Sequence, residues 1–229
     1  MNIYNTPYVL KESCNGTSRI SILDELMSKR EIFFIGEVNT DSVSNVILQL
    51  KCLEAQDPHA EITLYIDSTG GIVLDGLALY DVMQNLSCPI KTVCLGTAAS
   101  CAAFLFASGD TREILPHSEI MIHDPLVAGN GLTGTANSIN EKIDTLMRYR
   151  KTLASILAKH TGKTIEEIYE KTARNTVFCA QEAVEFGLAD RVIENTSSDR
   201  VSCKRAAAQR DIPENNISEN NNLENNNTT

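Results

Sequence analysis

Apolar and polar positions follow two different periods in the central part of this sequence. Short apolar runs at 32–36, 62–66 and 90–95 each end at a glycine or a polar turn. Segments whose apolar residues keep helical spacing follow them, most clearly over 41–54 and 135–160. Repeated strand–helix units of this kind predict an α/β fold with a parallel-rich sheet.

The pattern predicts individual elements along the chain. We expect strands at 32–36, 62–66 and 90–95, a strand pair at 113–115 and 119–122, a last strand at 189–193, and helices at 41–54 (capped by Asp41), 75–85, 100–108, 135–160, 164–172 and 180–186. The ends differ from this core. Residues 1–18 carry turn signals and predict an N-terminal arm or axial loop, whereas the Asn-rich composition of 195–229 predicts a disordered tail. The domain is therefore expected over residues 19–194.

Composition narrows the classes of function. The net charge of −10 argues against binding to nucleic acid or to anionic membranes, because both need a basic face. No apolar run approaches the roughly 20 residues that cross a membrane, and the N-terminus lacks a signal-peptide pattern. The seven cysteines and four histidines are scattered without metal-ligand spacing. We expect a cytoplasmic protein with reduced cysteines, no metal, no nucleic-acid partner and no membrane anchor.

Ser100 lies in a run of small residues between an apolar strand and a helix of Ala and Phe. The start of a helix carries free backbone N–H groups and a positive dipole, so the N–H of Cys101 would face an oxyanion formed at Ser100. The simpler interpretation is that Ser100 caps the helix, because capping serines greatly outnumber nucleophiles. This segment by itself favours the cap.

Two further segments come after strands of the same predicted sheet. Gly70 and Gly71 follow the strand 62–66, and paired glycines permit a positive φ and close backbone approach. His123 precedes Asp124 and Pro125, and the proline should end its strand. Ligands gather at the carboxyl ends of parallel strands, which places the glycine turn and Ser100 at one edge. Alone, the turn is more often a simple turn and the histidine a buried core residue.

Four motifs occur in a fixed order between residues 70 and 190. They are Gly-Gly-Ile-Val-x-x-Gly-Leu-Ala-Leu-Tyr-Asp-Val-Met-Gln (70–84), Gly-Thr-Ala-Ala-Ser (96–100), Met-Ile-His-Asp-Pro (121–125) and Ala-x-Glu-Ala-Val-Glu-Phe-Gly-Leu-Ala-Asp (180–190). Together they resemble the proteolytic subunits of the Clp protease, the ClpP family, over about residues 15–194.

The resemblance implies a crotonase-like, ClpP-type fold of repeated ββα units with a long handle helix, the segment around 128–150 matching the handle. It also implies heptameric rings, stacked in pairs around a closed chamber, that receive unfolded polypeptide from a hexameric Clp-type ATPase. ATP is used by that partner, and no cofactor is expected in this chain.

The resemblance also implies the site residues of a serine peptidase. Ser100 is the nucleophile, His123 is the base, and the N–H groups of Gly71 and Cys101 form the oxyanion hole. Substrate would pair with two strand edges that contain Gly70, Ile72, Val73, Leu126 and Val127.

The sequence departs from the family pattern at its third triad position. Asn175 stands where the family has the triad aspartate, and Ala173 replaces the acid that, with Arg174, links the two rings. Asparagine can accept a hydrogen bond from the imidazole but offers it no charge. We therefore expect weak activity of the chain alone, and either a mixed assembly with an active paralogue or activation by a partner. Lys51 and Cys52 replace an apolar pair of the ATPase docking cleft, and Thr69 replaces a proline in the oxyanion turn.

Two other functions stay open at this stage. One is a catalytically impaired subunit that regulates or completes a mixed ring, which Asn175 and Lys51 favour and the intact Ser100 and His123 oppose. The other, more remote, is an acyl-CoA hydratase-like enzyme, because paired glycines also suit a thioester oxyanion hole.

Overall fold

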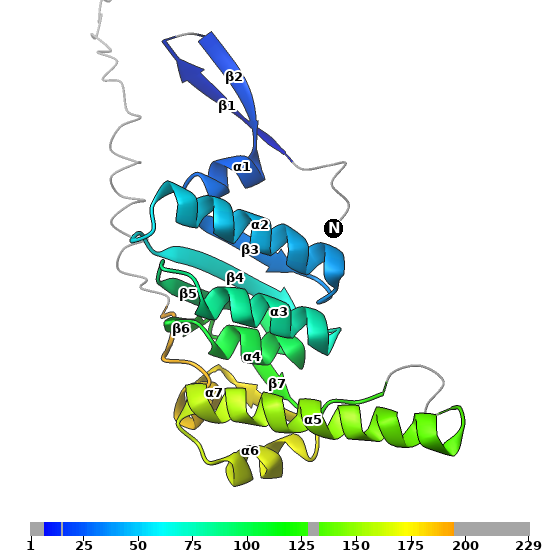
Figure 1. Cartoon of the computed structure of the whole chain (residues 1–229). Helices are drawn as coiled ribbons and strands as arrows, with labels where there is room; N and C mark the ends of the chain where they lie inside the picture. Colours follow the sequence, from blue (N-terminus) through cyan, green and yellow to red (C-terminus); the bar gives the residue numbers. More distant parts are fainter. Residues whose placement is uncertain (1–6, 15, 128–132, 195–229) are drawn as a thin grey trace, which may run out of the picture. The chain divides into compact units, whose positions relative to one another are not determined.

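The computed structural model describes residues 7–14, 16–127 and 133–194 (Figure 1). The strands are β1 (Tyr8–Ser13), β2 (Gly16–Ser21), β3 (Glu31–Ile35), β4 (Ile62–Ser68), β5 (Ile90–Ala99), β6 (Thr111–Ile114), β7 (Glu119–Ile122), β8 (Thr176–Cys179) and β9 (Arg191–Val192). The helices are α1 (Ile22–Met27), α2 (Thr40–Gln56), α3 (Val73–Gln84), α4 (Cys101–Ala107), α5 (Ala136–Thr161), α6 (Ile165–Thr172) and α7 (Ala180–Phe186). The predicted tail, 195–229, lies outside the described residues.

The main sheet is parallel, as the alternating pattern predicts. Its order is β3-β4-β5-β6-β9, with β7 beside the second half of β5 and β8 antiparallel to β7. The prediction that the segments 113–115 and 119–122 pair with each other is wrong. Both β6 and β7 run parallel to β5, so the link 115–118 continues the chain direction without reversing it. In this link the Leu115 N–H and the Ser118 hydroxyl both donate to the Cys94 carbonyl, at 3.1 and 3.2 Å.

The helices α2, α3 and α4 lie side by side across the sheet (Figure 1). Every residue of α4 is buried, which places this short helix at the centre of the hydrophobic core. Its alanines permit close approach, and the core includes the large side chains Phe34, Phe104 and Phe106. Because α4 is enclosed, its first residue, Cys101, is held rigidly behind Ser100.

The start of α2 differs from the prediction in its capping residue. Asn39, and not Asp41, is the N-cap: its side chain accepts from the Ser42 N–H at 3.0 Å, and the Ser42 hydroxyl oxygen accepts from the Asn39 N–H at 3.1 Å. This reciprocal capping box satisfies two backbone donors, whereas Asp41 already lies within the first turn.

The long helix α5 has Thr135, the first residue of the expected helix, as its N-cap, but it packs along only part of its length. Its buried residues are Ala154, Ile156 and Leu157, all in the second half. In the first half Ile143 is 40% exposed and Met147 53%. Figure 1 shows this half extending beyond the rest of the domain. The apolar spacing therefore predicts the helix correctly, although the single chain does not cover its whole apolar face.

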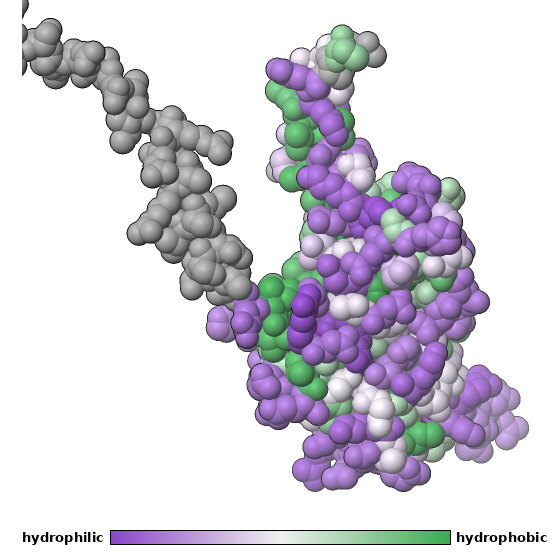
Figure 2. Space-filling model, turned by 90° about the vertical axis from the view of Figure 1, so that its left-hand side faces the viewer, coloured by the Kyte–Doolittle hydropathy of each residue, from purple (hydrophilic) through white to green (hydrophobic). Residues whose placement is uncertain are grey.

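At the N-terminal end, β1 and β2 form an antiparallel hairpin, paired from Tyr8 with Ser21 to Ser13 with Gly16. Figure 2 shows hydrophobic residues on the surface of this projection. Leu10 is 71% exposed and Tyr8 55%. No helix among the described residues is long and apolar enough to cross a membrane.

Candidate active site

The predicted site residues come from three neighbouring strands. Gly70 and Gly71 follow β4, Ser100 follows β5, and His123 follows β7. Because β4, β5 and β7 are adjacent and parallel, their carboxyl ends meet at one edge of the sheet. The structure thus brings these segments together as the sequence predicts.

Ser100 occupies a strained turn between β5 and α4. Its φ of 56° and ψ of −120° are rare for a residue with a side chain, and its N–H donates to the Met121 carbonyl at 2.8 Å. Ser100 occupies the N-cap position of α4, but its side chain makes no capping hydrogen bond. A sharp strand-to-helix turn of this kind presents a side chain at the top of a sheet, and strain of this kind gathers at functional sites.

A bulge between β4 and β5 redirects the last residues of β5. The pairing register shifts between Ile66 and Ser68, and the Asp67 carboxylate accepts from the Thr97 N–H at 3.0 Å. A side chain at Gly96 would meet Asp67, because its Cβ would lie 2.8 Å from the carboxylate oxygen. Gly96 and Asp67 therefore form the kink that carries β5 to Ser100.

The two glycines after β4 pack too closely for any other residue. A Cβ on Gly70, where φ is +91°, would lie 2.7 Å from the Ser100 Cβ, and one on Gly71 would collide with the Val38 carbonyl. The Val38 backbone holds this loop: its N–H donates to the Gly70 carbonyl at 2.9 Å, and its carbonyl accepts from the Ile72 N–H at 2.8 Å. Since the C=O and N–H of a trans peptide point in opposite directions, the bond to the Gly70 carbonyl turns the Gly71 N–H away from Val38.

Cys101 connects α4 to the same loop. Its thiol donates to the Gly71 carbonyl, with 3.3 Å between sulfur and oxygen, and the residue is 2% exposed. Burial raises the pKa of the Cys101 thiol, so the thiol stays protonated and remains a donor near neutral pH. The peptide between Gly71 and Ile72 is therefore held at both ends, by Cys101 and by Val38.

His123 is half-buried, and its Nδ1 lies 2.6 Å from the main-chain oxygen of Asp124. Within the described residues the structure records no hydrogen bond from His123 to Ser100 or to Asn175. Asn175 is exposed and precedes Thr176, which pairs with Ile122 in the antiparallel ladder of β7 and β8. Continued by one residue, this register sets Asn175 opposite His123.

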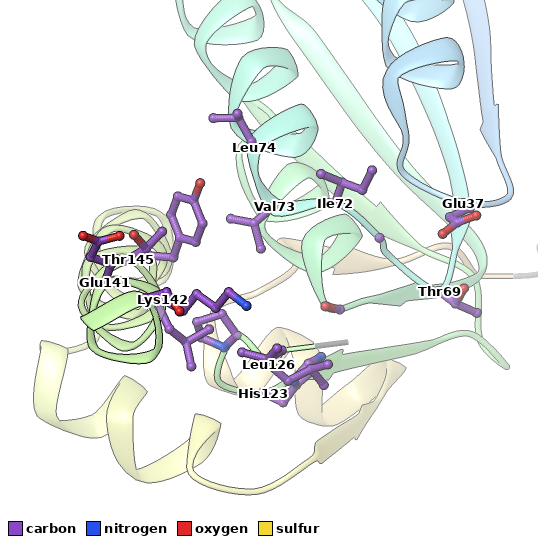
Figure 3. A pocket seen from close by; sticks show the side chains of 17 residues that line it. Glu37, Thr69, Ile72, Val73, Leu74, His123, Leu126, Glu141, Lys142 and Thr145 are labelled. Carbon is purple, nitrogen blue, oxygen red and sulfur yellow. The ribbon is translucent and has the colours of Figure 1, made fainter. Parts of the chain in front are cut away.

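One cavity of about 860 Å³ contains most of the predicted site. It is lined by Ser100, His123 and Gly71, and by both predicted substrate edges, Ile72–Val73 and Leu126–Val127. In Figure 3, Ile72 and Val73 at the start of α3 lie on one side, and Lys142 reaches in from α5. Gly70 lies behind this lining, buried against the Ser100 turn.

Sequence reasoning missed several residues that shape the site. Val38 acts through its backbone, which leaves no sequence signal. Ser68 follows a known turn pattern and could have been found: its buried hydroxyl accepts from the Gly70 N–H at 3.1 Å. In the ranges described, no group of His, Cys, Asp and Glu side chains is placed to hold a metal ion.

Comparison with protein families agrees with this geometry. The model of one family, described as Clp protease, matches residues 14–196. This range contains the main sheet, every helix of the described residues and every residue of the candidate site. The resemblance inferred from the four motifs, and the ClpP-type α/β fold it implies, are thereby confirmed: the chain belongs to the Clp protease family, a family of peptidases.

Proposed function

We propose that this chain is a serine-type endopeptidase subunit of an ATP-dependent Clp protease that cleaves unfolded polypeptides inside a double-ring chamber in the cytoplasm. The observation that carries the proposal is the single cavity that Ser100, His123 and Gly71 share with the segments 72–73 and 126–127. In this role Ser100 Oγ attacks the peptide carbonyl, and its proton passes to His123 Nε2. The N–H groups of Gly71 and Cys101 stabilise the oxyanion.

The expected strand edges are not strands in this structure, because Val73 begins α3 and residues 126–127 follow β7, but both segments are open to an extended peptide. Ile72 and Leu126 are exposed by 50% and 62%, and they belong to segments on either side of the cavity. A peptide laid between them would form backbone hydrogen bonds with both edges, a mode that tolerates many side chains. Such tolerance suits a peptidase whose substrates are unfolded proteins.

Labelling with a serine-reactive fluorophosphonate tests the nucleophile directly. We expect wild-type protein to be labelled at Ser100 and Ser100→Ala to stay unlabelled. His123→Ala should slow labelling by at least about 100-fold, because general-base assistance is worth 10²–10⁴. Ser87→Ala, a change at an exposed serine that does not line the cavity, serves as the control. Equal labelling of wild type and Ser100→Ala would contradict the proposal.

Asn175 favours a second candidate function, that of an impaired subunit in a mixed ring with an active paralogue. Its side chain is exposed and carries no charge for the imidazolium. Co-expression with the host's other family member, followed by assembly and peptidase measurements, separates the two. Activity that requires Ser100 of this chain supports the catalytic role, whereas unchanged activity with Ser100→Ala supports the structural one.

The partners follow from the family. We propose heptameric rings stacked in pairs, with a hexameric Clp-type ATPase as the source of substrate. The half-covered α5, with exposed Ile143 and Met147, supports contact with further copies of a similar chain. Ala173 replaces the family's acidic residue and leaves Arg174 without that partner, so we expect a weaker double ring. Sedimentation tests this, and a stable fourteen-subunit particle of this chain alone would contradict it.

A further inference from the structure

The histidine of a serine peptidase needs a fixed tautomer. Its Nε2 must be free of a proton to accept one from the serine, so Nδ1 must carry the ring proton. In this chain Asn175 replaces the carboxylate that normally holds Nδ1–H, and the structure gives Asn175 no bond to the ring. Some other group has to hold the proton on Nδ1.

The main-chain carbonyl of Asp124 is positioned to hold this proton. It lies 2.6 Å from His123 Nδ1. A carbonyl oxygen can only accept a hydrogen bond, so the contact requires the proton to be on Nδ1. In the neutral ring Nε2 is then the unprotonated nitrogen, which is the tautomer that a general base needs.

Asp124 is held in place by hydrogen bonds of its side chain and of its backbone N–H. One carboxylate oxygen accepts from the Thr172 hydroxyl at 2.7 Å, and the other pairs with Arg150 Nε at 2.7 Å. The Asp124 N–H donates to the Thr172 carbonyl at 2.8 Å. Arg150 also lies over the Tyr169 ring, 4.1 Å from its centroid.

These anchors come from two different helices. Arg150 belongs to α5, whereas Thr172 and Tyr169 belong to α6. Asp124 and Arg150 are only about one-third exposed, and each makes further contacts besides the ion pair, so the pair is better fixed than an isolated surface pair. A shift of α5 or α6 would move the Asp124 carbonyl and with it the ring.

We propose that Asp124, held by Arg150 and Thr172, is the positioning residue that fixes the His123 tautomer in place of the missing triad carboxylate. The carbonyl orients the ring but adds no full negative charge, so it supplies one of the two contributions of a triad aspartate. The effect on turnover rests on the proposed peptidase function, whereas the effect on the tautomer does not.

The tautomer can be observed directly by ¹⁵N NMR of protein labelled at histidine, because the chain has only four histidines. The His123 signals are assigned with His123→Gln. We expect a protonated Nδ1 and an unprotonated Nε2 in the wild type and in Ser100→Ala. Arg150→Met and Thr172→Val should give mixed tautomers, whereas the matched control Arg148→Met, an exposed arginine one half-turn away, should not.

Measurements of kcat and KM, and a double variant of Asp124 and Arg150, complete the test. We expect Arg150→Met to lower kcat about tenfold with KM unchanged, and Asp124→Asn, which keeps the Thr172 bond, to lower it less than Asp124→Ala. The double variant Asp124→Ala/Arg150→Met should lose no more than Asp124→Ala alone, since the two act as one unit.

Two results would overturn the proposal. One is a wild-type His123 with its proton on Nε2, and the other is an unchanged tautomer in both Arg150→Met and Thr172→Val. The proposed function fails separately: a Ser100 that resists fluorophosphonate in a protein with the expected tautomer contradicts the peptidase role and leaves the positioning role standing.

Discussion

Replacing Asn175 by aspartate should raise activity, but only modestly. The register of β7 and β8 sets residue 175 opposite His123, and opposed residues of an antiparallel pair have Cβ atoms about 5 Å apart. Two unit charges at about 5 Å interact by about 1 kcal/mol in water and about 3 kcal/mol at an effective dielectric constant of 20. Because Asn175 is exposed, the lower value applies, which corresponds to a gain of about fivefold.

The assay is kcat for a short fluorogenic peptide, with the fluorophosphonate labelling rate as a second readout. Asn175→Ala controls for loss of the amide, and Asn175→Asp/Ser100→Ala should be inactive. A buried, fully engaged triad aspartate is worth about 10⁴-fold. A gain of that size would refute the reasoning, because it would mean that residue 175, and not the Asp124 carbonyl, holds Nδ1–H. No gain at all would refute the proximity inferred from the strand register.

Three further predictions concern the site and the core. Gly70→Ala should lower the free energy of unfolding by about 2–4 kcal/mol, measured by urea denaturation, and abolish the labelling of Ser100. The new Cβ would lie 2.7 Å from the Ser100 Cβ, on a backbone with a φ of +91°. A stable variant that is still labelled would contradict the tight packing. Cys101→Ala should lower kcat about tenfold without changing KM, and Cys101→Ser, which keeps a donor for the Gly71 carbonyl, should stay within about threefold of wild type; equal values for both variants would exclude the thiol bond. Burial, helped by nearby cations, lowers the pKa of His160 from 6.5 to about 4. As the pH falls from 6.5 towards 4, the unfolded chain therefore binds a proton at this residue before the folded chain does, and the folded state loses stability. The melting temperature of His160→Gln should fall less than that of wild type between pH 7 and 5, and equal falls would contradict this.

The sequence pattern predicts most of the fold because the core elements have a clear period. The apolar runs of β3, β4 and β5 and the helical spacing of α2 and α5 appear where expected. The pattern misses β8, a four-residue strand whose exposed and buried positions give too short a repeat. It also pairs β6 with β7, because closeness in sequence cannot reveal that both lie along one long strand, β5.

The site is predictable where a residue type carries the chemistry and not where the backbone does. Ser100, His123 and the two glycines are visible in the sequence, and the parallel sheet explains why they meet. Ser100 takes the N-cap position without a capping bond, and no local pattern marks the positive φ of its backbone. The contributions of Val38 and of the Asp124 carbonyl depend on distances between main-chain atoms, and these exist only after folding.

The left-handed backbone conformation of Ser100 and its side-chain hydroxyl favour different amino acids at this position. Among residues, glycine best suits such a conformation, so the variant that would relax the turn is also the one that deletes the hydroxyl. Selection for a more stable fold and selection for a reactive side chain therefore favour different amino acids here. A subunit that does not cleave peptides would have no need of the hydroxyl, so glycine at this position would relax the turn without loss of function.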